Sequence, residues 1–182
     1  AGAGGIVRTL TKYDVLGRPW LATNPFRPGI SLPTDGWTRT LYDDIGRPIK
    51  VSSFDNPPSQ PPTATEASDT GDVTTVYSGP TVTGTDQAGK ARKSRTDGLG
   101  RLVEVLEPSS LGMLDVSTAY TYDARSNLTL VTQNDTFYDP DVTQERRFAY
   151  DALSRMTHSA MPEQTAPINE NGGWWSTKYV YD

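Results

Sequence analysis

Side chains that could do chemistry are few in this sequence of 182 residues. The chain holds no Cys and one His, His158, which excludes thiolate catalysis, iron–sulfur clusters and metal sites built from several histidines. His158 stands on a segment that we expect to be a strand, and no Ser occurs in a pattern that pairs a nucleophile with a base. We therefore predict no catalytic residue and no cofactor site, and a protein that is not an enzyme.

Three acidic residues, Asp139, Asp141 and Glu145, lie close together and could supply oxygen ligands to Ca²⁺. The segment lacks the Gly and the ligand spacing of a known calcium-binding loop. Solvated acidic side chains are the simpler interpretation, so no metal ligand is assigned, and calcium binding at these residues stays an open alternative.

Two adjacent aromatic residues, Trp174 and Trp175, are the remaining candidates for ligand contact. Neighbouring side chains on a strand point to opposite faces, so one of them can pack inward while the other is exposed. An exposed Trp could stack on a sugar ring or seal against the next structural unit. We favour sealing and keep ligand stacking as the alternative.

Composition narrows the fold and the partners. The net charge of −5 and the isoelectric point near 4.9 argue against nucleic-acid binding, which needs a basic face. No stretch approaches the roughly 18 apolar residues that span a bilayer, so no membrane span is expected. Thr, Tyr and Gly are abundant while long helix-forming segments are scarce, which indicates an all-β fold.

The elements that position these residues come from an internal repeat. The segment Tyr13–Trp20 recurs at Tyr42–Ile49 and Thr96–Val103, in weaker form at Tyr122–Leu128 and Tyr150–Met156, and begins again at Tyr181. Its aspartates are 26 to 31 positions apart, with one gap of 54 that holds a degenerate half-copy at Asp86–Lys90. The repeated residues are Tyr13, Asp14, Gly17, Arg18, Tyr42, Asp43, Gly46, Arg47, Asp97, Gly100, Arg101, Tyr122, Asp123, Tyr150, Asp151, Arg155, Tyr181 and Asp182.

The D-x-x-G pattern predicts a type I turn followed by a left-handed residue, which joins two antiparallel strands. Ser126 and Ser154 replace the Gly, and a left-handed conformation there would cost about 1 kcal/mol each. We expect the repeated Tyr to stack or hydrogen-bond between neighbouring hairpins. The repeated Arg should pair with turn acids or with carbonyls of an adjacent hairpin. All these motif roles are structural.

We divide the chain into a linker or leading strand over residues 1–8 and a repeat array over residues 9–182. A proline-rich insertion over residues 55–71 interrupts the array, and we interpret it as a loop rather than as a polyproline ligand. The sequence shows no charged-then-apolar leader, and we expect it to be a piece of a longer protein.

A Y-D-x-x-G-R motif repeated in this way resembles the Rhs, or YD-repeat, family, which includes bacterial Rhs polymorphic toxins, shell components of Tc toxins and the teneurins. The resemblance implies tandem antiparallel hairpins in a curved, spiralling sheet that forms a shell around a C-terminal cargo such as a toxin. It implies further YD repeats of a longer chain, or neighbouring copies, as partners, and a secreted or cell-surface bacterial location. Asp139-Pro140 lacks the Gly of the family's self-cleavage motif, so autoproteolysis is not implied, and Asn127 departs from the motif Arg.

Two other functions remain as alternatives to a shell segment. One is an extracellular adhesion module that uses exposed Trp and Tyr to bind glycans. The other is a fibre subunit that associates through unpaired sheet edges.

Overall fold

A computed structural model describes residues 6–27, 36–55, 58, 68, 71–135, 143–164, 168–170 and 173–182. No helix in this part of the chain is long and apolar enough to cross a membrane. The strands are β1 (Thr11–Tyr13), β2 (Pro19–Thr23), β3 (Trp37–Tyr42), β4 (Pro48–Phe54), β5 (Asp72–Ser78), β6 (Thr81–Thr85), β7 (Ala91–Thr96), β8 (Leu102–Pro108), β9 (Leu114–Tyr122), β10 (Leu128–Asp135), β11 (Thr143–Tyr150), β12 (Met156–Ala160), β13 (Ile168–Glu170), β14 (Gly173–Trp175) and β15 (Thr177–Lys178).

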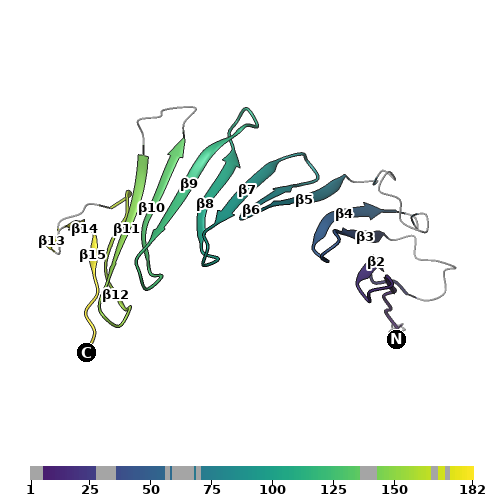
Figure 1. Cartoon of the computed structure of the whole chain (residues 1–182), viewed down its shortest axis with the longest axis horizontal. Helices are drawn as coiled ribbons and strands as arrows, with labels where there is room; N and C mark the ends of the chain where they lie inside the picture. Colours follow the sequence, from purple (N-terminus) through teal and green to yellow (C-terminus); the bar gives the residue numbers. More distant parts are fainter. Residues whose placement is uncertain are drawn as a thin grey trace, which may run out of the picture. The chain divides into compact units, whose positions relative to one another are not determined.

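Thirteen strands form one antiparallel sheet in simple chain order, from β1 to β12 and then β15, while β13 and β14 pair as a separate hairpin (Figure 1). The predicted all-β class, with tandem antiparallel hairpins, is confirmed. Contacts divide the chain into two compact units, the first holding residues 1–76 and 84–90 and the second residues 77–83 and 91–182.

The first unit has a small apolar core at one end of β2, β3 and β4. Leu21, Trp37 and Phe54 are each at most 5% exposed, and Trp20 packs against them. Trp37 lies directly opposite Phe54 across the β3–β4 pair, the kind of cross-strand contact that stabilises a sheet. Arg39 is fully buried on β3, and its guanidinium covers the Phe54 ring at 4.7 Å.

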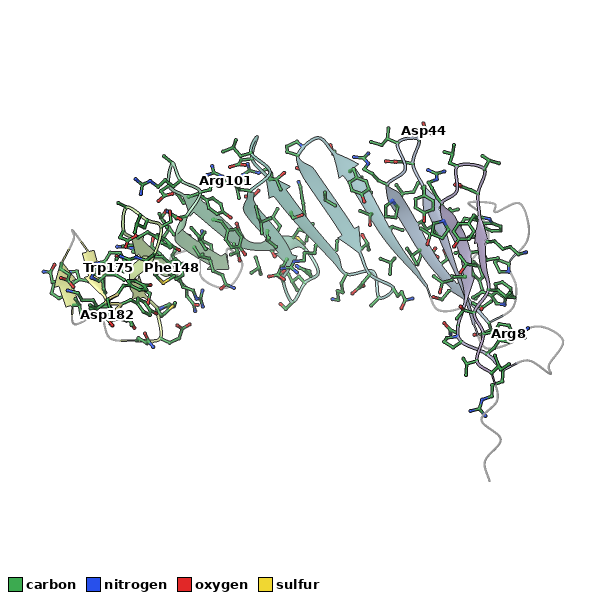
Figure 2. All side chains as sticks on the ribbon, turned by 90° about the horizontal axis from the view of Figure 1, so that it is seen from below. Arg8, Asp44, Arg101, Phe148, Trp175 and Asp182 are labelled. Atoms are coloured by element: carbon green, nitrogen blue, oxygen red, sulfur yellow. The ribbon has the colours of Figure 1, made fainter. Side chains whose placement is uncertain are left out.

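The second unit buries less. Its buried apolar side chains, among the described residues, are Val105, Val131 and Trp175. Most other strand residues are half-exposed, and side chains project from both faces of the strands (Figure 2). Cross-strand pairs and turn hydrogen bonds therefore have to carry much of the stability, which agrees with the modest hydrophobic content of 35%.

Each predicted hairpin contains a β-bulge just after its turn. In the β9–β10 pair, Tyr122 lies opposite Leu128 and Thr121 lies opposite Leu130, so Thr129 is the extra residue. Its hydroxyl donates to the Thr121 carbonyl at 3.1 Å. The same register shift occurs in the β1–β2, β3–β4, β7–β8 and β11–β12 pairs. The bulge adds local twist at the same place in every copy.

Strand order explains the long gap in the repeat. Connections in a meander alternate between the two ends of the strands. The five full copies of the motif follow the odd-numbered strands β1, β3, β7, β9 and β11. The half-copy at Asp86 follows β6, so it belongs to the other series of connections, although its turn has the same hydrogen bonds. The missing copy is instead the β5–β6 hairpin, which turns through Gly79 and Pro80.

Some sequence-based expectations lie outside the described residues. These are most of the proline-rich insertion over residues 55–71, residues 1–5, and the acidic residues Asp139 and Asp141. Residue Arg8, at the end of the predicted linker, forms a two-way backbone bridge with Phe26 at 2.8 Å in both directions.

Candidate functional site: the repeated turns at the strand ends

The five full motif copies form turns of one design, which we call the YD turns: Asp14–Gly17, Asp43–Gly46, Asp97–Gly100, Asp123–Ser126 and Asp151–Ser154. In Figure 1 the turns after β7, β9 and β11 lie at the lower ends of the strands of the second unit, and the turn after β8 lies at their upper ends. The YD turns are the candidate site; the first unit holds the turns at Asp14 and Asp43, and the second unit holds the other three.

Asp97 shows how the motif Asp organises its turn. Its backbone N–H donates to the Arg101 carbonyl at 2.9 Å, and the Gly100 N–H donates to the Asp97 carbonyl at 3.0 Å. Its Oδ1 accepts from the N–H of Leu99 at 2.9 Å and of Arg101 at 3.0 Å. The other four YD turns repeat this pattern.

The fourth turn residue is left-handed in every copy, as predicted. Gly100 has a φ of 78°, while Ser126 and Ser154 have φ values of 67° and 61°. Each Ser hydroxyl accepts a hydrogen bond from the preceding hairpin, at 3.2 Å from Arg101 Nη1 to Ser126 and from Asn127 Nδ2 to Ser154. The backbone strain of the Ser is therefore accompanied by a contact that Gly could not make.

The motif Arg closes its own turn. In four copies its Nε donates to the second carboxylate oxygen of the motif Asp at 2.7 Å. Hydrogen bonds from Arg101, the side chain first, hold the pKa of Asp97 below its ordinary value of 3.8. The pKa of each of the other four motif aspartates is also lowered.

The same Arg reaches the Tyr of the next hairpin. The guanidinium carbon of Arg101 lies 4.8 Å from the ring centre of Tyr122, and the Tyr122 hydroxyl donates to the carbonyl of Leu102, the residue after Arg101, at 2.8 Å. Arg101 Nη1 also donates to the Asp123 carbonyl at 3.4 Å. The equivalent ring contacts join Arg18 to Tyr42 at 4.6 Å and Arg155 to Tyr181 at 4.7 Å, with hydroxyl hydrogen bonds of 2.7 Å to the Pro19 and Met156 carbonyls.

The copy that lacks the Tyr keeps part of this joint. Thr96 stands in the Tyr position, and its hydroxyl donates to the Pro80 carbonyl of the preceding hairpin at 3.3 Å. Its backbone N–H donates to the same carbonyl at 3.0 Å.

The copy that lacks the Arg divides its two tasks between two residues. Asn127 takes the place within the turn, with its Nδ2 donating to Asp123 Oδ2 at 2.9 Å. Arg125, two positions earlier, takes over the contact to the next hairpin and donates to the Asp151 carbonyl at 3.5 Å and to the Ala152 carbonyl. The departure of Asn127 from the motif is thus compensated by Arg125, which the sequence pattern did not identify.

The third residue of each YD turn projects outward, and we call it the turn tip. Four tips are large aliphatic residues: Leu16 is 70% exposed, and Ile45, Leu99 and Leu153 are each 75% exposed. The fifth tip is Arg125. The sequence analysis did not single out this position, although four of the five full copies carry Leu or Ile there.

His158 belongs to a separate cluster at the end of the second unit. It is 3% exposed, its Nε2 lies 2.8 Å from Glu170 Oε1, and its ring centre lies 5.4 Å from that of Trp175. Lys178 Nζ lies 3.0 Å from Glu170 Oε2. Hydrogen bonds from Lys178 and then from His158 lower the pKa of Glu170 below 4.5. The cluster fixes the β13–β14 hairpin to the main sheet.

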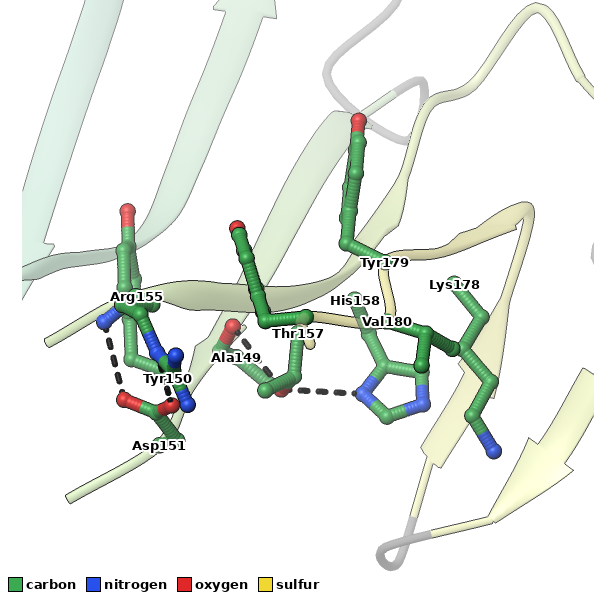
Figure 3. Close-up of a pocket in the computed structure, with 10 residues that line it drawn as sticks. Ala149, Tyr150, Asp151, Arg155, Thr157, His158, Lys178, Tyr179 and Val180 are labelled. Carbon is green, nitrogen blue, oxygen red and sulfur yellow. Dashed lines mark hydrogen bonds and ion pairs between the residues drawn. The ribbon is translucent and has the colours of Figure 1, made fainter. Parts of the chain in front are cut away.

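A groove of about 530 Å³ lies beside this cluster and is lined by Tyr150, Arg155, Lys178, Tyr179 and Tyr181 among others (Figure 3). The Arg155–Asp151 ion pair is at one end of the view, and His158 and Lys178 are at the other. Burial, and to a lesser extent the charge of Asp123, raise the pKa of Tyr150 above 10.0.

The two adjacent Trp residues differ in exposure. Trp175 is 8% exposed and its indole N–H donates to the Glu170 carbonyl at 2.8 Å, while Trp174 is 59% exposed. Stacking of a ligand on Trp174 stays a prediction. Of the three acidic residues considered for calcium, only Glu145 is described, and it pairs with Arg147 at 2.5 Å. The described residues contain no cluster of three or more side chains suited to a metal ion.

A comparison with protein families and with curated proteins finds no match to this chain. Among solved structures, the chain is similar to the crystal structure of TcdB2-TccC3-Cdc42, with 18% identity and a TM-score of 0.40, and to that of TcdB2-TccC3, with 18% identity and a TM-score of 0.39. Each match covers 84% of this chain and 6% of the other chain. This chain therefore spans only a small part of the length of the solved chains that it matches.

Proposed function

We propose that this chain is a non-enzymatic segment of a YD-repeat wall in a larger bacterial protein that is secreted or displayed at the cell surface. The wall joins further repeats of the same kind and encloses or displays a cargo such as a toxin domain. The observation that carries this proposal is the joint between hairpins. In three places a motif Arg packs on the next motif Tyr, while that Tyr bonds back to the residue after the Arg.

Such a joint is suited to an extendable array. A hairpin with the complete motif offers an Arg forward and a Tyr backward, so such hairpins can be added one after another without a new kind of contact. Tyr13 is the motif Tyr of the first copy and is 62% exposed. In later copies the equivalent Tyr42 and Tyr122 contact the motif Arg of the preceding hairpin. A preceding repeat with a motif Arg would cover it in the same way.

Protection of the cargo tests the proposal. The longer protein that contains this chain is purified and treated with a protease, and cleavage of the C-terminal region is compared with cleavage of that region produced alone. If the chain is part of a closed wall, we expect hollow particles by electron microscopy and slow cleavage of the C-terminal region enclosed in them. Cleavage at the same rate in both samples, or particles without a cavity, would contradict the proposal.

The groove supports a second candidate, the binding of a neutral sugar. Tyr150, Tyr179 and Tyr181 line it, and its charged residues Arg155 and Lys178 are already paired with acidic residues. Aromatic rings beside satisfied polar groups suit an uncharged polyhydroxylated ligand. Glycan-array binding that is lost in Tyr179→Ala and kept in Trp174→Ala would support this site, whereas no binding by the unmodified chain would exclude it.

A further inference from the structure

The connections at the two ends of the strands differ in how much their lengths vary. Each YD turn joins its two strands through five residues, from the motif Asp to the motif Arg or Asn127. The connections at the other strand ends, which we call the far connections, have very different lengths. Four of them cover residues 24–36, 109–113, 136–142 and 161–176, and the last of these contains the β13–β14 hairpin.

The strand register is nevertheless the same across these four far connections. In three of the strand pairs, the residue three places after a motif Arg lies opposite the residue three places before the next motif Tyr. These opposite pairs are Leu21 and Arg39, Glu104 and Ala119, and His158 and Lys178. In the β10–β11 pair, Leu130 and Arg147 have the same offset from Asn127 and Tyr150. The motif Arg position therefore stands opposite the next motif Tyr, whatever the length of the far connection.

Burial gives little protection against a slip of this register. A slip by two residues keeps every side chain on its own face of the sheet, so the alternation of side chains along the strands does not oppose it. In the described part of the second unit, only Val105, Val131 and Trp175 are buried apolar side chains. Few apolar contacts would be lost in a slip, and the register needs another determinant.

The joint between Arg101 and Tyr122 can supply it. The ring centre of Tyr122 lies 4.8 Å from the guanidinium carbon of Arg101, and its hydroxyl donates to the Leu102 carbonyl at 2.8 Å. Both contacts connect single residues at a fixed offset, so a slip by two residues would break both at once. The ion pair of 2.7 Å with Asp97 holds Arg101 in place, so the YD turn orients the contact to the next hairpin.

We propose that the Arg–Tyr joint is a register lock and that the far connections are the insertion side of the array, where added segments are carried without moving the strands. The β13–β14 hairpin is such a segment, because it stands between β12 and β15 while Arg155 still contacts Tyr181 at 4.7 Å. The entropy cost of closing a connection grows only with the logarithm of its length. The inference rests on the proposed function, since it says where a wall of this repeat carries added elements.

Insertion of one segment at either strand end tests the insertion side. A flexible Gly/Ser segment of about ten residues is placed after Leu111, in a far connection, or after Leu99, in a YD turn with the same backbone hydrogen bonds. We expect the insertion after Leu111 to lower the melting temperature only slightly. The insertion after Leu99 separates Asp97 from Arg101 and should lower it several-fold more. Equal effects at the two places would overturn the insertion side.

Engineered Cys pairs report the register, because the chain has no Cys of its own. Leu106 lies opposite Ser117, so Leu106→Cys with Ser117→Cys forms a disulfide in the native register. Leu106→Cys with Ala119→Cys forms one after a slip of two residues. With the segment inserted after Leu111, we expect the native disulfide at the level of the chain without the insertion, and little of the slipped one.

Removing the joint from the inserted chain should release the register. We expect Tyr122→Ala to raise the slipped disulfide about tenfold, the change in equilibrium that follows from losing a cation–π contact and a hydrogen bond. Tyr120→Ala is the matched control, because Tyr120 is on the same strand and takes no part in the joint. Arg101→Met keeps Tyr122 and removes the guanidinium, and it should give a similar rise, so the test stands even if Tyr122→Ala does not fold.

Two results would overturn the register lock. One is a slipped disulfide that is already abundant with the joint intact, and the other is an equal rise in Tyr120→Ala and Tyr122→Ala. Neither result bears on the proposed function. Hollow, cargo-protecting particles together with a register that survives loss of the joint would refute the lock and leave the wall. A working lock in a protein that leaves its C-terminal region unprotected would refute the wall and leave the lock.

Discussion

The guanidinium carbon of Arg101 lies 4.8 Å from the ring centre of Tyr122, while the Tyr122 hydroxyl donates to the carbonyl of Leu102, the residue after Arg101. One Arg and one Tyr from neighbouring hairpins are thus held by a cation–π contact and a hydrogen bond at once. In the sequence these two residues flank separate turns. In the structure they form a single joint, and this joint gives the repeat its direction along the chain.

Removing one hydroxyl should weaken this joint measurably. Tyr122→Phe keeps the ring under Arg101 but leaves the Leu102 carbonyl without its donor, so we expect the free energy of unfolding to fall by about 1 kcal/mol. Tyr13→Phe is the matched control, because Tyr13 has the same motif position and is 62% exposed. Urea denaturation measures both. Equal losses in the two variants would show that the hydroxyl bond between hairpins contributes nothing specific.

The division of tasks between Arg125 and Asn127 predicts a rescue. Arg125→Leu removes the hydrogen bonds to the Asp151 and Ala152 carbonyls and should lower the free energy of unfolding by about 1 kcal/mol. Adding Asn127→Arg rebuilds the motif of the other copies, with an Arg that can pair with Asp123 and reach Asp151. The double variant should therefore be more stable than Arg125→Leu alone.

A double-mutant cycle separates this compensation from a general effect of charge. The free energies of unfolding of the two single variants and the double variant are measured in urea. We expect a favourable coupling of about 1 kcal/mol. Additive effects would mean that Arg125 and Asn127 do not substitute for the motif Arg.

The local design of the turns could be predicted from the sequence, and their place in the sheet only partly. Asp and Gly at a fixed offset determine a backbone conformation by local hydrogen bonds. Aligning the repeat copies was therefore enough to predict a left-handed conformation at Ser126 and Ser154, which replace the Gly. The strand end at which a turn lies depends on the number of strands before it. The β5–β6 hairpin turns through Gly79 and Pro80 and has no motif Asp, so the sequence did not indicate this hairpin. Asp86 was therefore interpreted as a partial copy of the motif.

The replacement of a motif side chain by a neighbouring one, and contacts outside the repeat, could not be predicted from the sequence. Arg125 replaces a motif Arg only because position three of the turn can reach the next hairpin, which is a property of three-dimensional distance. Glu170 and Trp175 meet His158 from a hairpin that follows no repeat pattern. Periodicity identifies what recurs and is silent on contacts that occur once.

The left-handed Ser residues allow a test of strain against hydrogen bonding. Ser154→Ala keeps the strained conformation and loses the bond from Asn127, so it should be the least stable variant. Ser154→Gly also loses the bond but relieves the strain, and it should exceed Ser154→Ala by about 1 kcal/mol in free energy of unfolding. Urea titration of the two variants measures this difference. If Ala and Gly proved equally stable, the left-handed conformation at Ser154 would be contradicted.

Acid should weaken all five YD turns together. The pKa of each motif Asp is lowered in the folded chain below its ordinary value of 3.8, so the ionised carboxylate favours folding. The stabilisation is present above pH 4 or so and is lost as the pH falls through the folded-state pKa values. Thermal melting from pH 6 down to about pH 2 measures the loss. Asp97→Asn should reduce the pH dependence and start from a lower stability, and an unchanged acid profile in this variant would count against the role of Asp97.

The last prediction concerns the β13–β14 hairpin, which Glu170 connects to the main sheet through His158 and Lys178. Glu170→Gln removes the negative charge beside Lys178 Nζ and His158 Nε2 while keeping the shape of the side chain. The hairpin should then open more often, and the indole N–H of Trp175, which bonds to the Glu170 carbonyl, should exchange with solvent several-fold faster. Nuclear magnetic resonance can follow that single proton. Glu163→Gln is the control, because Glu163 forms a more exposed ion pair with Arg146 at 3.1 Å and such pairs contribute little. Unchanged exchange at Trp175 in Glu170→Gln would show that apolar packing alone holds the hairpin, whereas faster exchange in both variants would point to a general loss of stability and not to this anchor.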